Sequence, residues 1–446
     1  MRKRSINIVH ITGYLAVFFS FFAGFQFNFW NAAPEEEFNN FFKPDEALII
    51  GRLVKSQHDG IFSSAGLSGS CIKSEEDERD IGLQFHNYKN GIPCDKYRPY
   101  QSQIGFPGIF FSILDNISPF TKQTNIFLFR AITGFLLAFV LSIVVRWFHL
   151  ETGFLSALFL FIGILLSIWI TFMGNVIWYQ IWVGYLPFLV LLFLLRKESQ
   201  WKKISEIRII ILTSLAVFIN FLVHGYEWAS SILFMTTVPL FYYWFKDNWN
   251  FRRLARRFLY IAIGSVSAMA TTFIILAWQI SVVTGSFING INYIIFSFNK
   301  RAHGLGEDTP ERIRDHFEGS YLEIFNIYFS TNALSISKHI TYRFPSVGEF
   351  VQFYELILLF LIVSLLSLLI IEIGKISRDI ASTTKALIAA TWISMLAPFT
   401  WFIIFKGHSY SHTHMDPITW YMPFCLLGFA MVGMFFNIFY LSLRKK

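Results

Sequence analysis

A short acidic motif opens an apolar helical pattern early in the chain. The segment Lys43 to Leu53 begins with Pro44, Asp45 and Glu46. Pro suits the first turn of a helix and carboxylates meet the positive end of its dipole, so a plain helix start is one interpretation. The other is chemical. Asp45 and Arg52 are seven residues apart and share one helical face, which favours a general base, with Glu46 as its closest substitute, beside a cation for phosphate.

The segment Lys406 to Pro417 contains three of the eleven histidines of the chain. In an extended backbone His412, His414 and Asp416 share one side, so two imidazoles and a carboxylate could hold a divalent metal ion. The same side chains could instead bind a phosphate or a sugar through hydrogen bonds, with Lys406 as the phosphate cation. A polar loop at the membrane interface is the third interpretation. The histidines are His408, His412 and His414.

Two further sites place an ionisable residue in an apolar context. Glu227 is the only acid between Glu206 and Asp247, within a turn that begins at His224. An ionisable group near lipid is expensive unless it is paired, which favours a functional role, and nearby aromatic rings suit sugar binding. The alternative interpretation is that Glu227 is solvated and that the aromatic residues beside it only anchor the turn at the membrane interface. Arg130 either reaches outward to water or binds a substrate phosphate.

Lys300 and Arg301 open a segment that ends at Gly306. This segment could be a flap over a phosphate, and a solvated basic loop is equally compatible with the pattern. Its glycines follow no predicted strand, so they do not form a nucleotide-binding loop. Direct use of a sugar nucleotide is therefore disfavoured.

The composition predicts an all-α polytopic membrane protein in a single transmembrane domain, residues 1–446. Of the 446 residues, 54% are apolar and 15% charged, against roughly 25% charged in a soluble domain. Apolar runs near the length of a membrane span recur along the whole chain. We expect about ten spans, at residues 9–29, 124–146, 153–173, 181–195, 209–223, 229–245, 258–280, 350–372, 386–405 and 417–441.

The positive charges predict the orientation of these spans. With both termini in the cytoplasm, the cytoplasmic segments hold 20 of the 37 Lys and Arg residues but 4 of the 29 acids. The net charge of +8 is thus explained by membrane topology rather than by nucleic-acid binding. We expect a multi-pass protein of a bacterial inner membrane.

Two long segments are expected on the extracytoplasmic side, residues 30–124 and 281–349. The first holds an apolar stretch at 101–111 that is too short to cross, so we expect an interfacial or re-entrant helix. Cys71 and Cys94 lie in the same segment, and an oxidising compartment favours a disulfide between them, with two free thiols as the alternative.

The two long outer segments and Asp45-Glu46 after the first span resemble the GT-C superfamily of membrane glycosyltransferases. The family carries its catalytic acid in such a pair after the first helix. The resemblance implies transfer of a sugar from a polyprenyl-phosphate donor to a glycan or lipid-linked acceptor on the outer face, with inversion and with Asp45 as the base. The chain is also loosely similar to serotype-converting O-antigen glucosyltransferases.

The first hypothesis is therefore a hexosyltransferase of the GT-C type, with a surface glycan such as the O-antigen of lipopolysaccharide as acceptor. A transporter or flippase of a lipid-linked or anionic substrate is the main alternative, and an O-antigen polymerase or ligase is another. A transporter places ionisable residues at the middle of its spans, whereas here the acids and histidines lie at the outer ends. Beyond a divalent ion at His412, His414 and Asp416, no cofactor is expected, and no nucleic-acid partner.

Overall fold

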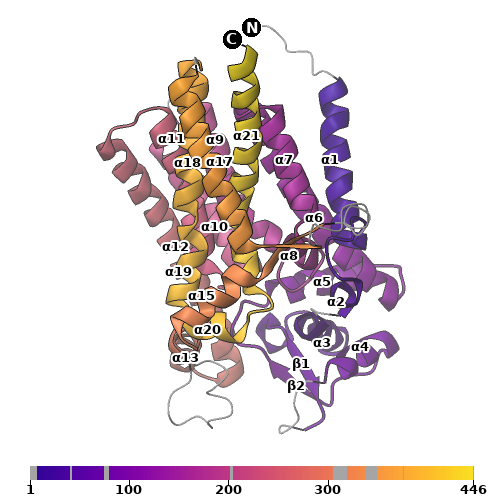
Figure 1. Cartoon of the computed structure of the whole chain (residues 1–446). Helices are drawn as coiled ribbons and strands as arrows, with labels where there is room; N and C mark the ends of the chain where they lie inside the picture. The colour runs from indigo at the N-terminus through magenta and orange to yellow at the C-terminus, as the bar shows by residue number, and fades with distance from the viewer. Residues whose placement is uncertain are drawn as a thin grey trace.

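The computed structural model describes residues 8–40, 43–74, 80–200, 204–304, 319–336, 349–374 and 376–444. It is 78% helical, with two short two-stranded sheets in the described part. Figure 1 shows a bundle of roughly parallel helices with a smaller helical layer at one end. α1 (Ile8–Phe27) begins at the same end of the bundle at which α21 (Phe424–Arg444) ends. The smaller layer lies at the opposite end.

The long apolar helices identify a multi-pass membrane protein. In the described residues, six segments are long and apolar enough to cross a membrane. They are α6 (Lys122–Glu151), α10 (Glu206–Val223), α12 (Phe251–Thr284), α17 (Phe353–Ile373), α18 with α19 (Arg378–Ser394 and Leu396–Ile404) and α21.

The predicted count of about ten spans is not confirmed. The other four predicted spans also contain helices, which are not among these six segments of the described residues. They are α1, α7 (Phe154–Leu165), α9 (Leu186–Gln200) and α11 (Ala229–Lys246). The third predicted span is interrupted, since α7 ends before Ser167, which caps the short helix α8 (Ile168–Met173). A short 3-10 helix, η2 (Ile181–Tyr185), precedes α9.

The bundle surface is apolar where a bilayer would be its solvent. On α17, Leu358, Ile362 and Leu365 are exposed, as lipid-facing side chains of a span must be. Inside, small residues bring helices close together. A Cβ at Gly433 of α21 would lie 2.2 Å from the carbonyl oxygen of Leu155, so only glycine permits this approach to α7.

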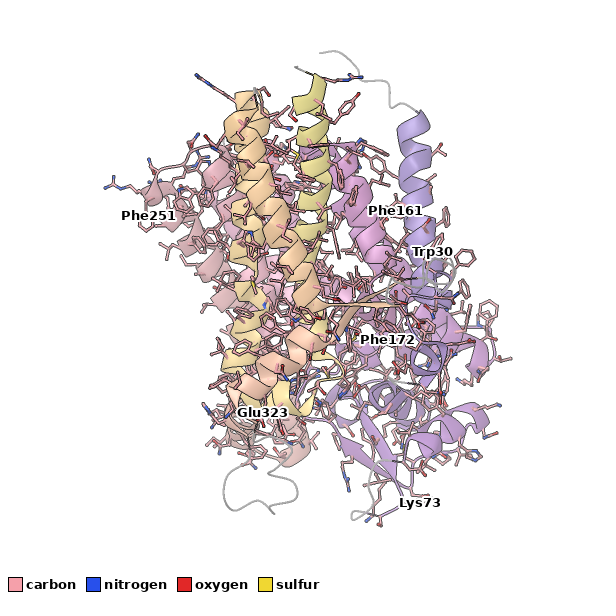
Figure 2. The ribbon with its side chains drawn as sticks, in the orientation of Figure 1. Trp30, Lys73, Phe161, Phe172, Phe251 and Glu323 are labelled. Atoms are coloured by element: carbon pink, nitrogen blue, oxygen red, sulfur yellow. A yellow bond between two sulfur atoms is a disulfide. The ribbon has the colours of Figure 1, made fainter. Side chains whose placement is uncertain are left out.

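The first of the two long segments, predicted at 30–124, folds as a compact layer of helices around a β-hairpin in its described residues. β1 (Gly69–Ile72) pairs antiparallel with β2 (Lys96–Pro99), and Cys71 and Cys94 form a disulfide beside this pairing. Figure 2 shows Lys73, just beyond β1, at the end of the molecule farthest from the start of α1. The helices are α2 (Glu35–Asn40), α3 (Lys43–Asp59), α4 (Ile81–Asn90) and α5 (Phe106–Ile117), with the 3-10 turn η1 (Ser63–Gly66).

α3 is the centre of this layer. Most of its residues from Glu46 to Val54 are buried, and Gly51 allows the helix to touch the hairpin, because a Cβ there would meet the carbonyl oxygen of Gly69 at 2.3 Å. The stretch 101–111, expected to be an interfacial or re-entrant helix, is helical only from Phe106, where α5 begins, and its place relative to a membrane stays a prediction.

The second long segment contributes α13 (Phe287–His303), which packs on α12 and on the short helix α20 (Lys406–Ser411). Part of the predicted segment 281–349 lies outside the described residues. Its described remainder holds α15 (Tyr321–Ser330) and β3 (Asn332–Ser335), which pairs antiparallel with β4 (Phe350–Gln352). The 3-10 helix η4 (Asp416–Tyr421) follows α20 and leads into α21. Described parts of the two long segments thus meet at one end of the bundle (Figure 1), where Ser102 contacts Tyr293 and Ser297.

Candidate functional site

The turn between α10 and α11 carries Glu227 into the protein rather than to its surface. Gly225 adopts a φ of +76° and Trp228 a φ of +51°. Glycine accepts this left-handed conformation freely, whereas a bulky residue does so at a cost of about 1–3 kcal/mol. Trp228 is fully buried, so the alternative interpretation, in which the aromatic residues beside Glu227 are interfacial anchors, is wrong for this residue. The turn is held in a strained form that aims Glu227 inward.

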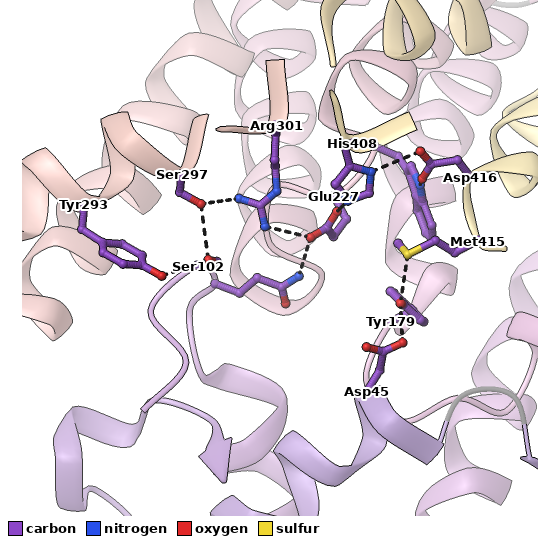
Figure 3. A network of polar contacts seen from close by, with 12 residues as sticks. Asp45, Ser102, Tyr179, Glu227, Tyr293, Ser297, Arg301, His408, Met415 and Asp416 are labelled. Atoms are coloured by element: carbon purple, nitrogen blue, oxygen red, sulfur yellow. Dashed lines mark hydrogen bonds and ion pairs between the residues drawn. The ribbon is translucent and has the colours of Figure 1, made fainter. Parts of the chain in front are cut away.

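Glu227 is the centre of a buried group of polar side chains, drawn in Figure 3. Its Oε1 accepts from Arg301 at 3.0 Å and from Gln103 at 3.3 Å, and its Oε2 forms an ion pair with His408 Nε2 at 3.1 Å. Only 5% of Glu227 is exposed. We call Gln103, Glu227, Arg301, His408 and Asp416 the Glu227 cluster.

Asp416 occupies the other side of His408. Its Oδ2 lies 3.1 Å from His408 Nδ1 and accepts from Trp401 Nε1 at 2.8 Å, while Oδ1 accepts from Trp228 Nε1 at 2.7 Å. His408 therefore bridges two carboxylates, one from each side of its ring. Together with Arg301, the four charged side chains form a balanced set of two anions and two cations.

This balance shifts the titration of the cluster. Burial alone would raise the pKa of Glu227, but Arg301 and His408 outweigh it and hold that pKa well below its usual range. Burial alone would lower the pKa of His408, and the two carboxylates raise it instead to about 9. Burial, followed by repulsion from His408, lowers the pKa of His412 to about 3. His408 is thus charged and His412 neutral near neutral pH.

These two shifts predict a stability maximum near the ordinary histidine pKa of 6.5. The raised pKa of His408 means that its stabilisation is complete below pH 6.5 and is lost as pH rises towards about 9. The lowered pKa of His412 means that its contribution is lost as pH falls from 6.5 towards about 3. Thermal midpoints in lipid nanodiscs, measured across this range, should form a bell. His408→Gln should flatten the alkaline limb and His412→Gln the acidic limb; unchanged limbs in both variants would contradict the assignment.

Asp45 lies at the first turn of α3 and is partly buried. The hydroxyl of Tyr179 donates to Asp45 Oδ2 at 2.7 Å and lies 3.2 Å from the sulfur of Met415. The carboxylate of Asp45 also interacts electrostatically with the imidazole ring of His414. Figure 3 shows the contacts from Asp45 through Tyr179 to Met415, and the peptide bond from Met415 to Asp416 links them to the Glu227 cluster.

Glu46 points to a different neighbour. It is buried, pairs with Arg130 of α6 and accepts a hydrogen bond from the backbone N–H of Ile177 at 3.3 Å. The two acids of the motif are therefore distinct. The carboxylate of Glu46 is occupied by a guanidinium, whereas the partly exposed Asp45 is the better placed of the two to meet a substrate.

Two cavities adjoin these groups. An apolar cavity of about 260 Å³ lies against α12 and α13 and has Arg301 and Ser297 among its lining residues. We call it the α12–α13 cavity; its other lining residues include Tyr226, Met269, Phe273 and Phe298. A larger, open and more polar cavity of about 580 Å³, the α3–β2 cavity, is lined by Pro44, Leu48, Ser70, Arg98 and Tyr100. The first turn of α3 thus borders open space.

The other sequence-predicted residues have different surroundings. Arg52 donates to the carbonyl oxygens of Gly60, at 3.0 Å, Ile61 and Ser63, so its visible role is to fix the loop after α3. Lys406 lies over the ring of Tyr321. The ring of His224 contacts the carbonyl oxygen of Tyr179. Neighbouring Arg301 and burial lower the pKa of Lys300, with burial the larger cause.

The prediction of an extended backbone from His412 to Asp416 is wrong. Residues 406–411 are helical, 412–415 form turns, and η4 begins at Asp416. The carboxylate of Asp416 faces His408 and two tryptophans instead of aligning with His412 and His414. Within the described ranges, no group of three His, Cys, Asp or Glu side chains has a metal-binding arrangement. The metal hypothesis stays a prediction.

Several site residues were missed in the sequence. Tyr179 and Trp401 lie in apolar stretches where an aromatic residue indicates only packing, and Gln103 gave no signal of its own. The hydroxyl of Ser297 accepts from Arg301 and donates to Ser102, which places the rim of the α12–α13 cavity in contact with the cluster. Their polar atoms are recognisable only through contacts between distant parts of the chain.

Comparisons of the chain with protein-family models, with curated proteins and with solved structures gave no match.

Proposed function

We propose that this protein is a GT-C-like glycosyltransferase of about ten membrane spans, which transfers a sugar from a polyprenyl-phosphate donor on the extracytoplasmic side of a bacterial inner membrane. The observation that carries the proposal is the α12–α13 cavity, an apolar space bordered by Arg301. A chain of contacts connects Arg301 to Asp45. A polyprenyl-phosphate donor needs an apolar space for its lipid tail beside a cation for its phosphate.

The proposed reaction uses Asp45 as the base. The acceptor hydroxyl oxygen attacks C1 of the donor sugar while its proton passes to Asp45. The bond between C1 and the phosphate oxygen breaks, and its electron pair leaves with the phosphate as polyprenyl phosphate. Attack from the side opposite to the leaving group inverts C1. The hydroxyl of Tyr179, 2.7 Å from Asp45, orients the carboxylate.

Arg301 supplies positive charge where the leaving phosphate gains negative charge. Its charge is fixed in place by Glu227 and Ser297, and such preorganised groups are usually the largest contribution to catalysis. The buried ion pair of His408 supports Glu227 from the other side. Burial opposes the charge of Arg301, but Glu227 outweighs it and raises the pKa of Arg301.

The proposal also accounts for the position of the charged groups. α3 with Asp45 and α20 with His408 lie at the end of the bundle that also carries β1 and its disulfide (Figure 1). A disulfide persists in an extracytoplasmic compartment, and lipid-linked sugars are consumed there by enzymes of this type. With ten spans, the orientation predicted by the basic residues places both termini in the cytoplasm.

The direct biochemical test is release of the lipid carrier. Purified protein in nanodiscs is incubated with polyprenyl-phosphate sugars and an extract of the surface glycan, and free polyprenyl phosphate is measured by mass spectrometry. Release that requires both donor and glycan supports the proposal. Donor that crosses the bilayer of a proteoliposome without release of polyprenyl phosphate supports the flippase alternative instead.

A further inference from the structure

Tyr179, whose hydroxyl donates to Asp45, lies in a turn between α8 and η2, and only 2% of it is exposed (Figure 3). Burial, followed by the charge of Asp45, raises the pKa of Tyr179 well above its usual value. The hydroxyl therefore stays protonated and holds the carboxylate of Asp45 without taking up its proton. The contacts that hold Tyr179 itself come from the turn between α10 and α11.

His224 of that turn holds the backbone of Tyr179. Nδ1 of the His224 ring contacts the carbonyl oxygen of Tyr179. A carbonyl oxygen can only accept, so Nδ1 is the ring nitrogen that carries the hydrogen and donates it. Since His224 is 1% exposed, its ring acts on the protein around it.

The residue after Tyr179 shows what this hydrogen bond opposes. Gln180 has a φ of +47°, in the left-handed region that few residues other than glycine adopt. A flip of the peptide plane between Tyr179 and Gln180 would return this φ to a negative value. The same flip would turn the carbonyl oxygen of Tyr179 away from His224. The hydrogen bond from His224 thus keeps the turn in its strained form, in which Tyr179 reaches Asp45.

Trp228 holds the ring of Tyr179 in the same position. The centroids of these two rings lie 5.5 Å apart, and the centroid of the His224 ring lies 5.0 Å from that of Trp228. The indole N–H of Trp228 donates to Asp416, which pairs with His408, so the indole is itself fixed. The backbone and the ring of Tyr179 are therefore both held by the turn between α10 and α11.

We propose that His224 is a positioning residue of the transfer reaction. Through the backbone of Tyr179, it keeps the tyrosine hydroxyl on the carboxylate of Asp45. The inference rests on the proposed function, in which Asp45 is the base. Strained backbone is typical of functional sites, and here Gln180 and Trp228, both with positive φ, meet at one tyrosine. A misplacement of about 1 Å can cost about 10²-fold in rate, so a residue that never meets the substrate can still set the rate.

The test places a fluorine label on the tyrosine. Tyr179 of the full-length protein in nanodiscs is replaced by 3-fluorotyrosine, and the fluorine NMR chemical shift is compared between variants. Asp45→Asn gives the reference shift of a hydroxyl without its carboxylate partner. His224→Leu has no donor for the carbonyl oxygen and should move the signal towards this reference. His224→Asn should keep the native signal, because its amide nitrogen is as many bonds from Cβ as Nδ1 is.

A second label separates positioning from a general disturbance of the fold. 3-Fluorotyrosine at Tyr242, near the other end of α11, should not respond to His224→Leu, since the hydroxyl there donates to Glu151. A native signal at Tyr179 in His224→Leu, or an equal change at Tyr242, would overturn the proposal. If His224→Leu does not fold, His224→Gln replaces it, because its amide lies one carbon further from the backbone. The same change is then expected, and a native signal overturns the proposal.

Transfer rates give the second readout. His224→Leu should lower single-turnover transfer by about 10- to 100-fold, leave donor binding unchanged, and be rescued by His224→Asn. In the Asp45→Asn background the same substitution should have no further effect, since it acts through Asp45. Additive losses in the double variant would overturn the proposal. The fluorine signal needs no transfer, so a native protein that transfers no sugar would contradict the proposed function while the label still tests the role of His224.

Discussion

Asp45→Asn should lower the rate of sugar transfer by about 10²- to 10⁴-fold, the usual contribution of a general base. Asparagine keeps the size of the side chain and can still contact the hydroxyl of Tyr179, but it cannot accept the proton of the acceptor. The helix-start charge that is lost is worth only about 0.3–1 kcal/mol of stability. The variant should therefore fold, remain in the membrane and bind the lipid donor. The measurement is single-turnover transfer with donor binding assayed in parallel.

Asp59→Asn is the matched control, since it changes the same chemical group at the other end of α3, where Asp59 is exposed and pairs with Lys55. It should transfer at the native rate. Glu46→Gln should act mainly through the loss of its ion pair with Arg130. Near-native transfer by Asp45→Asn, by Glu46→Gln and by the double variant would make these acids structural and would remove the chemical basis of the GT-C resemblance.

Glu227→Gln should have the second large effect, on stability as well as on transfer. The substitution leaves Arg301 and His408 without the anion that they share, and breaking a buried ion pair in this way costs about 3–5 kcal/mol. Thermal unfolding in nanodiscs should shift to lower temperature, and transfer should fall with it.

A double variant distinguishes the two roles of the pair. Glu227→Gln with Arg301→Gln removes one anion and one cation, so the charge balance of the cluster returns and most of the lost stability should return with it. Transfer should stay low, because the cation proposed for the leaving phosphate is absent. Recovery of transfer together with stability would show that Arg301 serves only the fold.

The sequence predicted which segments form helices better than it predicted which of them contact one another. Long apolar runs such as 353–373 can only be buried or face lipid, so the helices were recognisable from composition. The β1–β2 hairpin was missed because its strands have four residues each and pair across two dozen intervening residues. β1 is buried at all four positions and so does not alternate, and the four alternating residues of β2 are too few to identify a strand.

The sequence predicted several residues of the site but not the side chains with which they pair. Glu227 was singled out as the only acid of an apolar stretch, Arg301 as part of a basic segment and His408 as one of three neighbouring histidines. The structure brings these three side chains together. The bridge from His408 to Asp416 depends on the turn of the chain after α20, which an extended interpretation of the loop could not anticipate. Tyr179 reaches Asp45 from 134 residues away, and no local pattern encodes that contact.

The central claim is tested most directly by the mass of the surface glycan in cells that carry the gene, in cells that lack it, and in cells that express Asp45→Asn. The account predicts that the native gene adds one sugar residue to the glycan and that the deletion and the Asp45→Asn variant both lack it. An unchanged glycan in all three strains, with an altered pool of lipid-linked sugar in the deletion, would contradict transfer by this protein and would identify movement of the lipid-linked sugar as its activity.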